Sequence, residues 1–316
     1  MISNKLFPMY PYLKSMIIFA LIVCTRSQAQ NVNLDSLLDA STKKESNKKQ
    51  YTNATFTSTR LIDGHTVETT QAGVLDLKIS HRFGSVNEGF YNIFGLDAAS
   101  MRIGADYGIT NRLTIGGGRS TYEKQYDGFL KYRLLWQSQR EHSMPISLTL
   151  LSSVMYETDT TALKSEKQIS IHPRETDKFS FAYQILIARK FSNAFSLQLM
   201  PTLIHENIVY NATSPNDLFA LGAGVKIQLT PRSNINLEYY YQLPGYKLPN
   251  TYNTFSIGYE LETAGHVFQL HFTNSTGMTE RTVISENQGQ WSKGDIHFGF
   301  NISRVFTIKK SKPLNL

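Results

Sequence analysis

Most of this chain consists of short runs in which apolar and polar side chains alternate. In residues 295–306, DIHFGFNISRVF, every second residue from Ile296 to Ile302 is apolar, and the residues between them are polar or glycine. A two-residue period is typical of a β-strand with one apolar and one polar face. Such an apolar face can be covered by the core of a soluble sandwich or by the hydrocarbon of a membrane, and the two alternatives imply different functions.

Twelve runs of this kind can be marked, and the links between them alternate in length. The links 110–111, 192–193 and 263–265 are short and follow even-numbered runs, whereas most links after odd-numbered runs are long. Tight periplasmic turns and longer external loops are typical of outer-membrane barrels. The sequence therefore predicts an all-β fold, an antiparallel transmembrane β-barrel of about twelve strands. The expected strands are residues 74–83, 99–109, 112–119, 126–137, 146–156, 179–190, 195–204, 218–229, 235–242, 252–262, 266–273 and 295–306.

The amino terminus has the features of a cleaved export signal. Positive residues precede the apolar segment 16–23, and a small-residue cleavage site follows at residues 27–29. We expect removal of residues 1–29, which takes away three positive charges, lowers the formal charge from +7 to +4 and removes Cys24, the only cysteine. The mature chain then has no thiol for a disulfide or a metal, and its charge is too small to predict a nucleic-acid partner.

Residues 30–73 are expected to form a periplasmic segment ahead of the barrel at 74–306, and residues 307–316 a carboxyl-terminal tail. Residues 54–71, ATFTSTRLIDGHTVETTQ, flank an Asp-Gly pair, which is a strong hairpin signal. Neither half of this stretch has a continuous apolar face to offer lipid. We therefore expect a hairpin inside or beneath the barrel that can act as a plug. The alternative is two further wall strands, which would make fourteen in all.

Three stretches resemble a family of β-barrel proteins from Bacteroidota that is known only as a domain of unknown function. They are TRLIDGHTVETTQAGVLDLKISHRFG (residues 59–84), FGLDAASMRIGADYGITNRLTIGGGRS (94–120) and DGFLKYRLLWQ (127–137). The resemblance implies an outer-membrane location. It supplies no catalytic or ligand-binding residues.

The charged residues expected to point into the barrel are the best indication of function. Every second residue of a strand should point into the barrel. On this rule basic side chains face the lumen from the first, second and fourth strands, and acidic side chains face it from the ninth, tenth and twelfth. Two interpretations remain open: cross-lumen salt bridges that fill the interior, or the charged wall of a channel. The expected lumen residues are Lys78, Arg82, Arg102, Lys131, Arg133, Glu238, Glu260, Glu262 and Asp295.

Signals for catalysis or cofactors are weak. Ser152 and His81 both fall on the apolar face, as a lipid-cleaving barrel enzyme would require, but on separate strands and without an orienting partner. His271 and His297 fall on the last two strands, where hydrogen bonding in the lumen is a simpler role than metal binding. No cofactor or metal is expected. Pro201 interrupts its run, which predicts a bulge or distortion there.

These features favour a narrow pore or ligand-holding barrel for small polar solutes. About twelve strands lie between eight-stranded barrels filled by side chains and larger barrels with open channels. The alternatives are a structural protein that presents its outer loops or periplasmic hairpin to a partner and, with less support, a lipid-modifying enzyme. The expected surroundings are outer-membrane lipid, with the solute and any protein partner unidentified.

Overall fold

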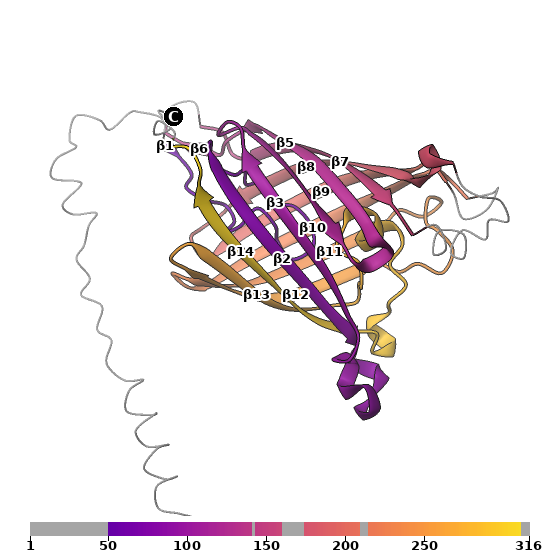
Figure 1. The fold of residues 1–316 in the computed structure, drawn as a ribbon. Coiled ribbons are helices and arrows are strands. Elements are labelled where there is room, and N and C mark those ends of the chain that lie inside the picture. Colours follow the sequence, from indigo (N-terminus) through magenta and orange to yellow (C-terminus); the bar gives the residue numbers. More distant parts are fainter. Residues whose placement is uncertain (1–49, 141–142, 160–173, 209–213, 311–316) are drawn as a thin grey trace, which may run out of the picture. The chain divides into compact units, whose positions relative to one another are not determined.

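The structure is a computed structural model that describes residues 50–140, 143–159, 174–208 and 214–310. The expected export signal, most of the segment before the hairpin, and the end of the tail lie outside these residues. Twelve antiparallel strands form a closed barrel (Figure 1). Its strands are β2 (Val74–Ser85), β3 (Ala99–Gly108), β4 (Leu113–Ser120), β5 (Gln125–Leu135), β7 (Ser147–Glu157), β8 (Phe179–Lys190), β9 (Phe195–Glu206), β10 (Asp217–Thr230), β11 (Ser233–Gln242), β12 (Thr254–Thr263), β13 (His266–Thr273) and β14 (His297–Thr307).

Each wall strand pairs with its neighbours in the chain, and β14 pairs with β2 to close the barrel. This confirms the twelve-stranded antiparallel barrel and rules out the alternative of fourteen. A separate two-stranded sheet joins β1 (Gln50–Tyr51) to β6 (Ser138–Gln139). The remaining elements are short helices in the links: η1 (Val86–Glu88), η2 (Phe90–Gly95), η3 (Tyr122–Lys124), η4 (Glu175–Lys178), η5 (Arg281–Ser285) and η6 (Trp291–Lys293).

The two faces of the wall differ as the alternation predicts. Outward side chains such as Ile103, Leu221 and Leu270 are 55%, 44% and 52% exposed, whereas residues between them in the strands are buried inside the barrel. Within the described residues, no helix has both the length and the apolar character to cross a membrane.

Pro201 distorts the pairing of β8 with β9 but does not create a bulge. The pairs Gln184–Thr202 and Ile187–Leu199 keep one register, while the two residue pairs between them are not bonded. Proline has no N–H to donate to the neighbouring strand, so the hydrogen-bond ladder is interrupted without an inserted residue.

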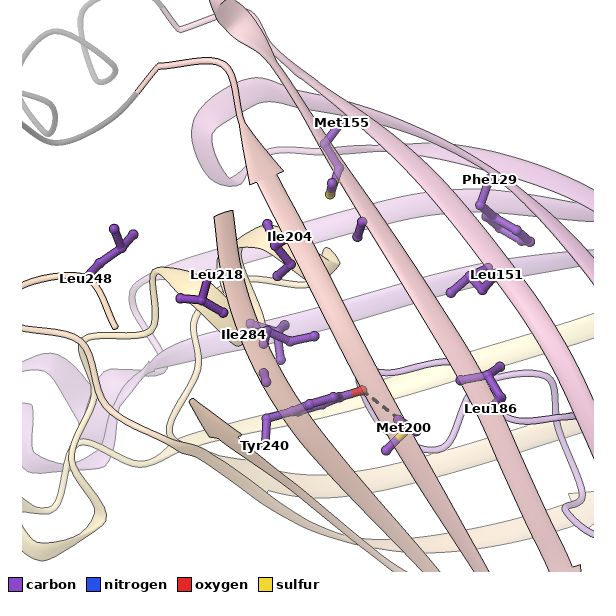
Figure 2. Close-up of a cluster of buried hydrophobic side chains, with 13 residues drawn as sticks. Phe129, Leu151, Met155, Leu186, Met200, Ile204, Leu218, Tyr240, Leu248 and Ile284 are labelled. Atoms are coloured by element: carbon purple, nitrogen blue, oxygen red, sulfur yellow. Dashed lines mark hydrogen bonds between the residues drawn. The ribbon is translucent and has the colours of Figure 1, made fainter. Parts of the chain in front are cut away.

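The barrel interior contains an apolar cluster among mostly polar side chains. The cluster is formed mainly by inward side chains of β5 and β7–β11, and Figure 2 shows Leu151, Leu186 and Met200 pointing into it. The Tyr240 hydroxyl lies 3.6 Å from the Met200 sulfur in this cluster. The buried inward residues of β12–β14 and β2–β4 are polar or glycine.

Candidate functional site

Residues 54–71, which we call the inner plug, occupy the lumen. An antiparallel bridge joins Arg60 to His65, and the Leu61 N–H donates to the Gly64 carbonyl at 2.9 Å, so the chain turns back at Asp63-Gly64. Leu61 is 1% exposed and Val67 is fully buried. The stretch forms a tight turn surrounded by the wall, and polar side chains from strands on all sides bind it.

Lys131 on β5 holds the carbonyl groups of the inner plug. Its ammonium group donates to the carbonyl oxygens of Thr59 and Thr66 at 3.1 Å and of Glu68 at 3.0 Å. An ammonium group has three donors and no acceptor, so the plug satisfies it fully. The cost of burying this charge is thereby reduced, and the plug is fixed to β5 through its backbone.

Glu238 on β11 holds the opposite end of the inner plug. Its carboxylate accepts hydrogen bonds from the N–H groups of Ile62 and Asp63, both at 3.0 Å, and of Gly64 at 2.7 Å. Three successive N–H groups at a turn form a concave anion site. Glu238 and Lys131 therefore bind opposite polarities of the plug backbone, the acid at the turn and the base at the open end.

Two other wall cations bind acidic side chains of the inner plug. Arg82 on β2 pairs with Asp63, and Arg133 on β5 pairs with Glu68 at 3.0 Å. The Asp63 carboxylate also accepts from Ser256 on β12 at 2.8 Å. These contacts spread over several strands, so movement of the plug would break charge-assisted bonds on more than one wall.

The remaining charged residues of the lumen bind wall residues on their own side of the barrel. Lys78 pairs with Asp76 and Asp106, and Arg102 pairs with Asp127. Glu260 accepts from the wall amides of Asn234, Asn236 and Gln269. Among the described residues no ion pair joins the basic residues of β2, β3 and β5 directly to Glu238 or Glu260, because the inner plug lies between them.

Glycines on the acidic side of the wall make room for the inner plug. A Cβ atom added at Gly224 on β10 would lie 2.5 Å from a Leu61 methyl group. One added at Gly258 on β12 would lie 3.2 Å from the end of Ile62. Two apolar side chains of the plug thus pack against bare backbone, and a side chain at either glycine would push them away from the wall.

Residues 274–287, which we call the outer loop, enter the same lumen from the link between β13 and β14. The guanidinium group of Arg281 is surrounded by Glu157 at 3.0 Å, Glu286 at 3.3 Å and Glu123. Burial disfavours the charge of Arg281, but the neighbouring carboxylates outweigh it and raise the pKa of the guanidinium. Ser285 donates to Glu206 at 3.0 Å, which fixes the end of the same turn.

The inner plug and the outer loop meet at Glu280. One of its carboxylate oxygens lies 3.4 Å from Arg60 and 3.2 Å from the Nε2 atom of His65. Burial holds the pKa of His65 well below its ordinary value, and Arg60 and Lys131 lower it further. A neighbouring lumen cavity of about 30 Å³, lined in part by Arg60 and Arg82, has room for about one or two water molecules.

Seven of the nine predicted lumen residues are buried inside the barrel, and two are placed elsewhere. Glu262 is exposed at the end of β12. Asp295 precedes β14 and accepts from the side chain of Asn87 at 2.7 Å in the outer links. Both expectations were wrong because the two residues lie where the wall no longer encloses the chain. There the alternation along a strand does not place a side chain inside the lumen.

The weak signals for chemistry do not come together in the structure. Ser152 on β7 and His81 on β2 are separated in the wall by β3, β4 and β5. His271 pairs with Gly299 rather than with His297, whose Nδ1 atom lies 2.9 Å from the Phe83 carbonyl. No group of three or more potential metal ligands of the His, Cys, Asp and Glu types occurs in the described part of the chain.

Comparison with known proteins identifies the family. The model of a family described as "Membrane bound beta barrel domain (DUF5777)" matches residues 56–306. No curated protein matches the chain. Among solved structures, the NanC porin has a TM-score of 0.44 at 8% identity over 74% of this chain and 98% of its own. Omp33 of Acinetobacter baumannii has a TM-score of 0.40 at 5% identity, over 73% of this chain and 97% of its own. An outer membrane channel from Pseudomonas putida F1 has a TM-score of 0.41 at 13% identity, over 78% of this chain and 100% of its own.

The family match covers the inner plug as well as the wall. Closed antiparallel barrels are the form in which strands cross the bacterial outer membrane, because closure leaves no unpaired strand edge in lipid. The outer membrane is therefore the location of this barrel. The chain belongs to the family of membrane-bound β-barrel domains that its residues 56–306 match.

Proposed function

We propose that the protein is a gated pore for small polar solutes, closed by the inner plug and opened when that plug leaves the lumen. The observation that carries this proposal is the way in which the plug is bound. Lys131 and Glu238 hold it by three hydrogen bonds each to its backbone. When the plug leaves, water or a polar solute can take over these hydrogen bonds with the wall. Apolar contacts in a sealed core could not be replaced by water in this way.

Displacement of the inner plug would expose a charged passage. Lys131 and Arg133 would line one wall, and Glu238 and Glu260 the other. Fixed charges at a constriction set the ion preference of a pore. The passage would thus suit small polar or charged solutes. In the closed state the neighbouring cavity of about 30 Å³ leaves room for water only.

A structural or partner-binding role is the second candidate, and a specific observation favours it. The lumen is filled from both ends, by the inner plug and by the outer loop, and Glu280 joins the two. A barrel that never opens would present its external loops or periplasmic face to a partner. We assign no catalytic role to the protein, since Ser152 and His81 lie on distant strands. We expect outer-membrane lipid around the wall and, from the sequence resemblance, a bacterium of the Bacteroidota as the source.

The test is ion selectivity of the barrel without its inner plug. A deletion of residues 54–71 would be reconstituted in planar bilayers under a salt gradient, alone and with Lys131 and Arg133 both changed to Glu. We expect the double reversal to shift the reversal potential toward cation preference, because two positive charges on one wall become negative. Lys247→Glu, in the link after β11, is the control and should shift it much less. A folded deletion variant that passes no ions would favour the structural role.

A further inference from the structure

A groove lies in the outer, membrane-facing side of the wall, away from the lumen. It has a volume of about 740 Å³ and crosses β5, β7, β8, β9 and β10. Its sides are formed by large outward side chains, among them Leu150, Tyr183 and Phe219, which are 39%, 48% and 37% exposed. The lining contains no charged residue. The groove is therefore a hollow in a surface that lipid covers.

Small residues explain why the wall recedes at this place. Ser152 on β7 pairs directly with Tyr183 on β8, and Pro201 on β9 lies in the same lining. Neither residue fills the space that Leu or Phe occupies at other outward positions. Residues whose side chains point inward, such as Ala220 and Leu151, also belong to the lining, so the groove reaches down to the backbone of the strands.

The interrupted ladder lies at the same place. The two unbonded residue pairs between β8 and β9 include Pro201. The Met200 carbonyl accepts from the hydroxyl of Thr202 at 2.9 Å. The wall beneath the groove thus has fewer hydrogen bonds between strands than the wall elsewhere on β9, where pairing with β10 is continuous.

We propose that this groove binds one acyl chain of a membrane lipid. Five neighbouring strands span on the order of 20 Å at the usual strand spacing, so the hollow is long enough for an extended chain. Its apolar lining favours hydrocarbon over any polar solute. Lipid is the occupant because the groove continues on every side into the exposed apolar face of a membrane-bound barrel. The site does not depend on the inner plug or on transport.

The test maps where acyl chains touch the wild-type barrel. The full mature chain would be placed in nanodiscs of a phospholipid with a photoreactive diazirine in the middle of one acyl chain, irradiated and analysed by mass spectrometry. We expect crosslinks at Leu150, Tyr183 and Leu203 at least fivefold above those at Leu270 and Phe272 on β13, which are at least as exposed as Leu150. Equal yields at both places would show bulk lipid only and overturn the proposal.

A filling variant sharpens the test. Ser152→Phe should lower crosslinking at Tyr183 and Leu203 at least threefold, since its ring would occupy the groove. Ala105→Phe, at an outward position of β3 away from the groove, is the matched control and should leave those yields unchanged. Loss of crosslinks in both variants, or in neither, would contradict the proposal. Should the filled barrel fail to fold, the wild-type map decides alone.

Discussion

The inner plug and the outer loop fill one lumen, but the wall holds them differently. The inner plug is bound mainly through its backbone, by Lys131 and Glu238 on opposite walls. The outer loop is also bound through backbone groups, since Gln242 and Thr254 donate to its carbonyl groups, but it carries in addition a buried cation, Arg281. The carboxylates around Arg281 are Glu123 and Glu157 from elsewhere in the chain and Glu286 of the loop itself. Loss of one backbone contact leaves the others of the plug in place, whereas loss of Arg281 leaves several buried carboxylates without their compensating charge.

Two single-cysteine reporters separate the two segments. Val67 in the inner plug and Ser285 in the outer loop are both fully buried. The chain's only cysteine is Cys24, so in a chain that begins after residue 29, as the expected cleavage would leave it, a cysteine placed at either position would be unique. The rate of maleimide labelling then reports how often each segment leaves the lumen, and each variant below is measured with both reporters.

Arg281→Ala should have the largest effect. Removing one partner of a buried ion cluster costs about 3–5 kcal/mol, because the remaining charges lose their compensation. The outer loop should move out so that water reaches the glutamates, and labelling at position 285 should rise by about two to four orders of magnitude. Labelling at position 67 should change far less. Arg281→Lys keeps the charge and should retain part of the protection; equal loss with Lys and Ala would mean that charge is not what holds the loop.

Glu238→Gln should have an intermediate effect on the inner plug. The amide has one fewer acceptor and places an N–H₂ group against backbone N–H groups, at a cost of about 1.5–3 kcal/mol. Labelling at position 67 should rise roughly tenfold to a hundredfold, with little change at position 285. Glu88→Gln is the control, since Glu88 binds Ser85 and Asn92 in the links rather than the plug. A similar rise in both variants would show that general loosening of the barrel is being measured.

Gly224→Ala should have a smaller effect of the same kind. Its methyl group would lie 2.5 Å from a flexible end of Leu61, and overpacking costs about 1–3 kcal/mol. Gly128→Ala is the control, because the nearest atom to its methyl group would be 3.7 Å away, on Val154. Labelling at position 67 should increase for the first variant alone. Unchanged labelling for Gly224→Ala would mean that Leu61 does not anchor the plug.

The smallest effect should come from His65, at the junction between the inner plug and the outer loop. It should appear as a dependence of opening frequency on pH. Burial lowers the pKa of His65, so the docked plug favours the neutral ring. The stabilisation is fully present above a pH of about 6.5 and decreases as the pH falls below it, by at most about 1.4 kcal/mol per pH unit. Arg60, Lys131, Asp106 and Glu280 surround the ring and are the other charges at the junction. Opening events in bilayer recordings should become more frequent between pH 7 and pH 5 and lose this dependence in His65→Asn; an unchanged dependence would assign the titration to another group.

The wall could be predicted from the sequence because one physical rule covers every strand. Alternate residues face lipid and lumen, so β2 and β8 were located to within two residues and Lys131 was placed inside. The alternation rule wrongly placed Glu262 and Asp295 in the lumen, because the enclosing wall ends there. The inner plug was expected from Asp63-Gly64 and the lack of an apolar face, which are local signals.

What the lumen charges bind could not be predicted. Lys131 and Glu238 looked like the facing walls of a channel because the hairpin signal at Asp63-Gly64 does not indicate which wall residues bind the backbone of the turn. The outer loop was missed altogether, since NSTGMTERTVISEN has no period of two and Arg281 meets two of its carboxylate partners, Glu123 and Glu157, only through the closure of the barrel. The length of the link between β13 and β14 was the one signal available.

The most direct test of the gated pore is single-channel current through the wild-type barrel and through the barrel lacking residues 54–71. Both would be refolded from the mature chain and inserted into planar bilayers under identical salt and voltage. The filled lumen predicts that the wild type is closed for most of the recording, while the deletion variant conducts in long, stable openings. A correctly folded deletion variant as silent as the wild type, or a wild type that conducts steadily with its plug in place, would contradict the claim that the inner plug is the gate.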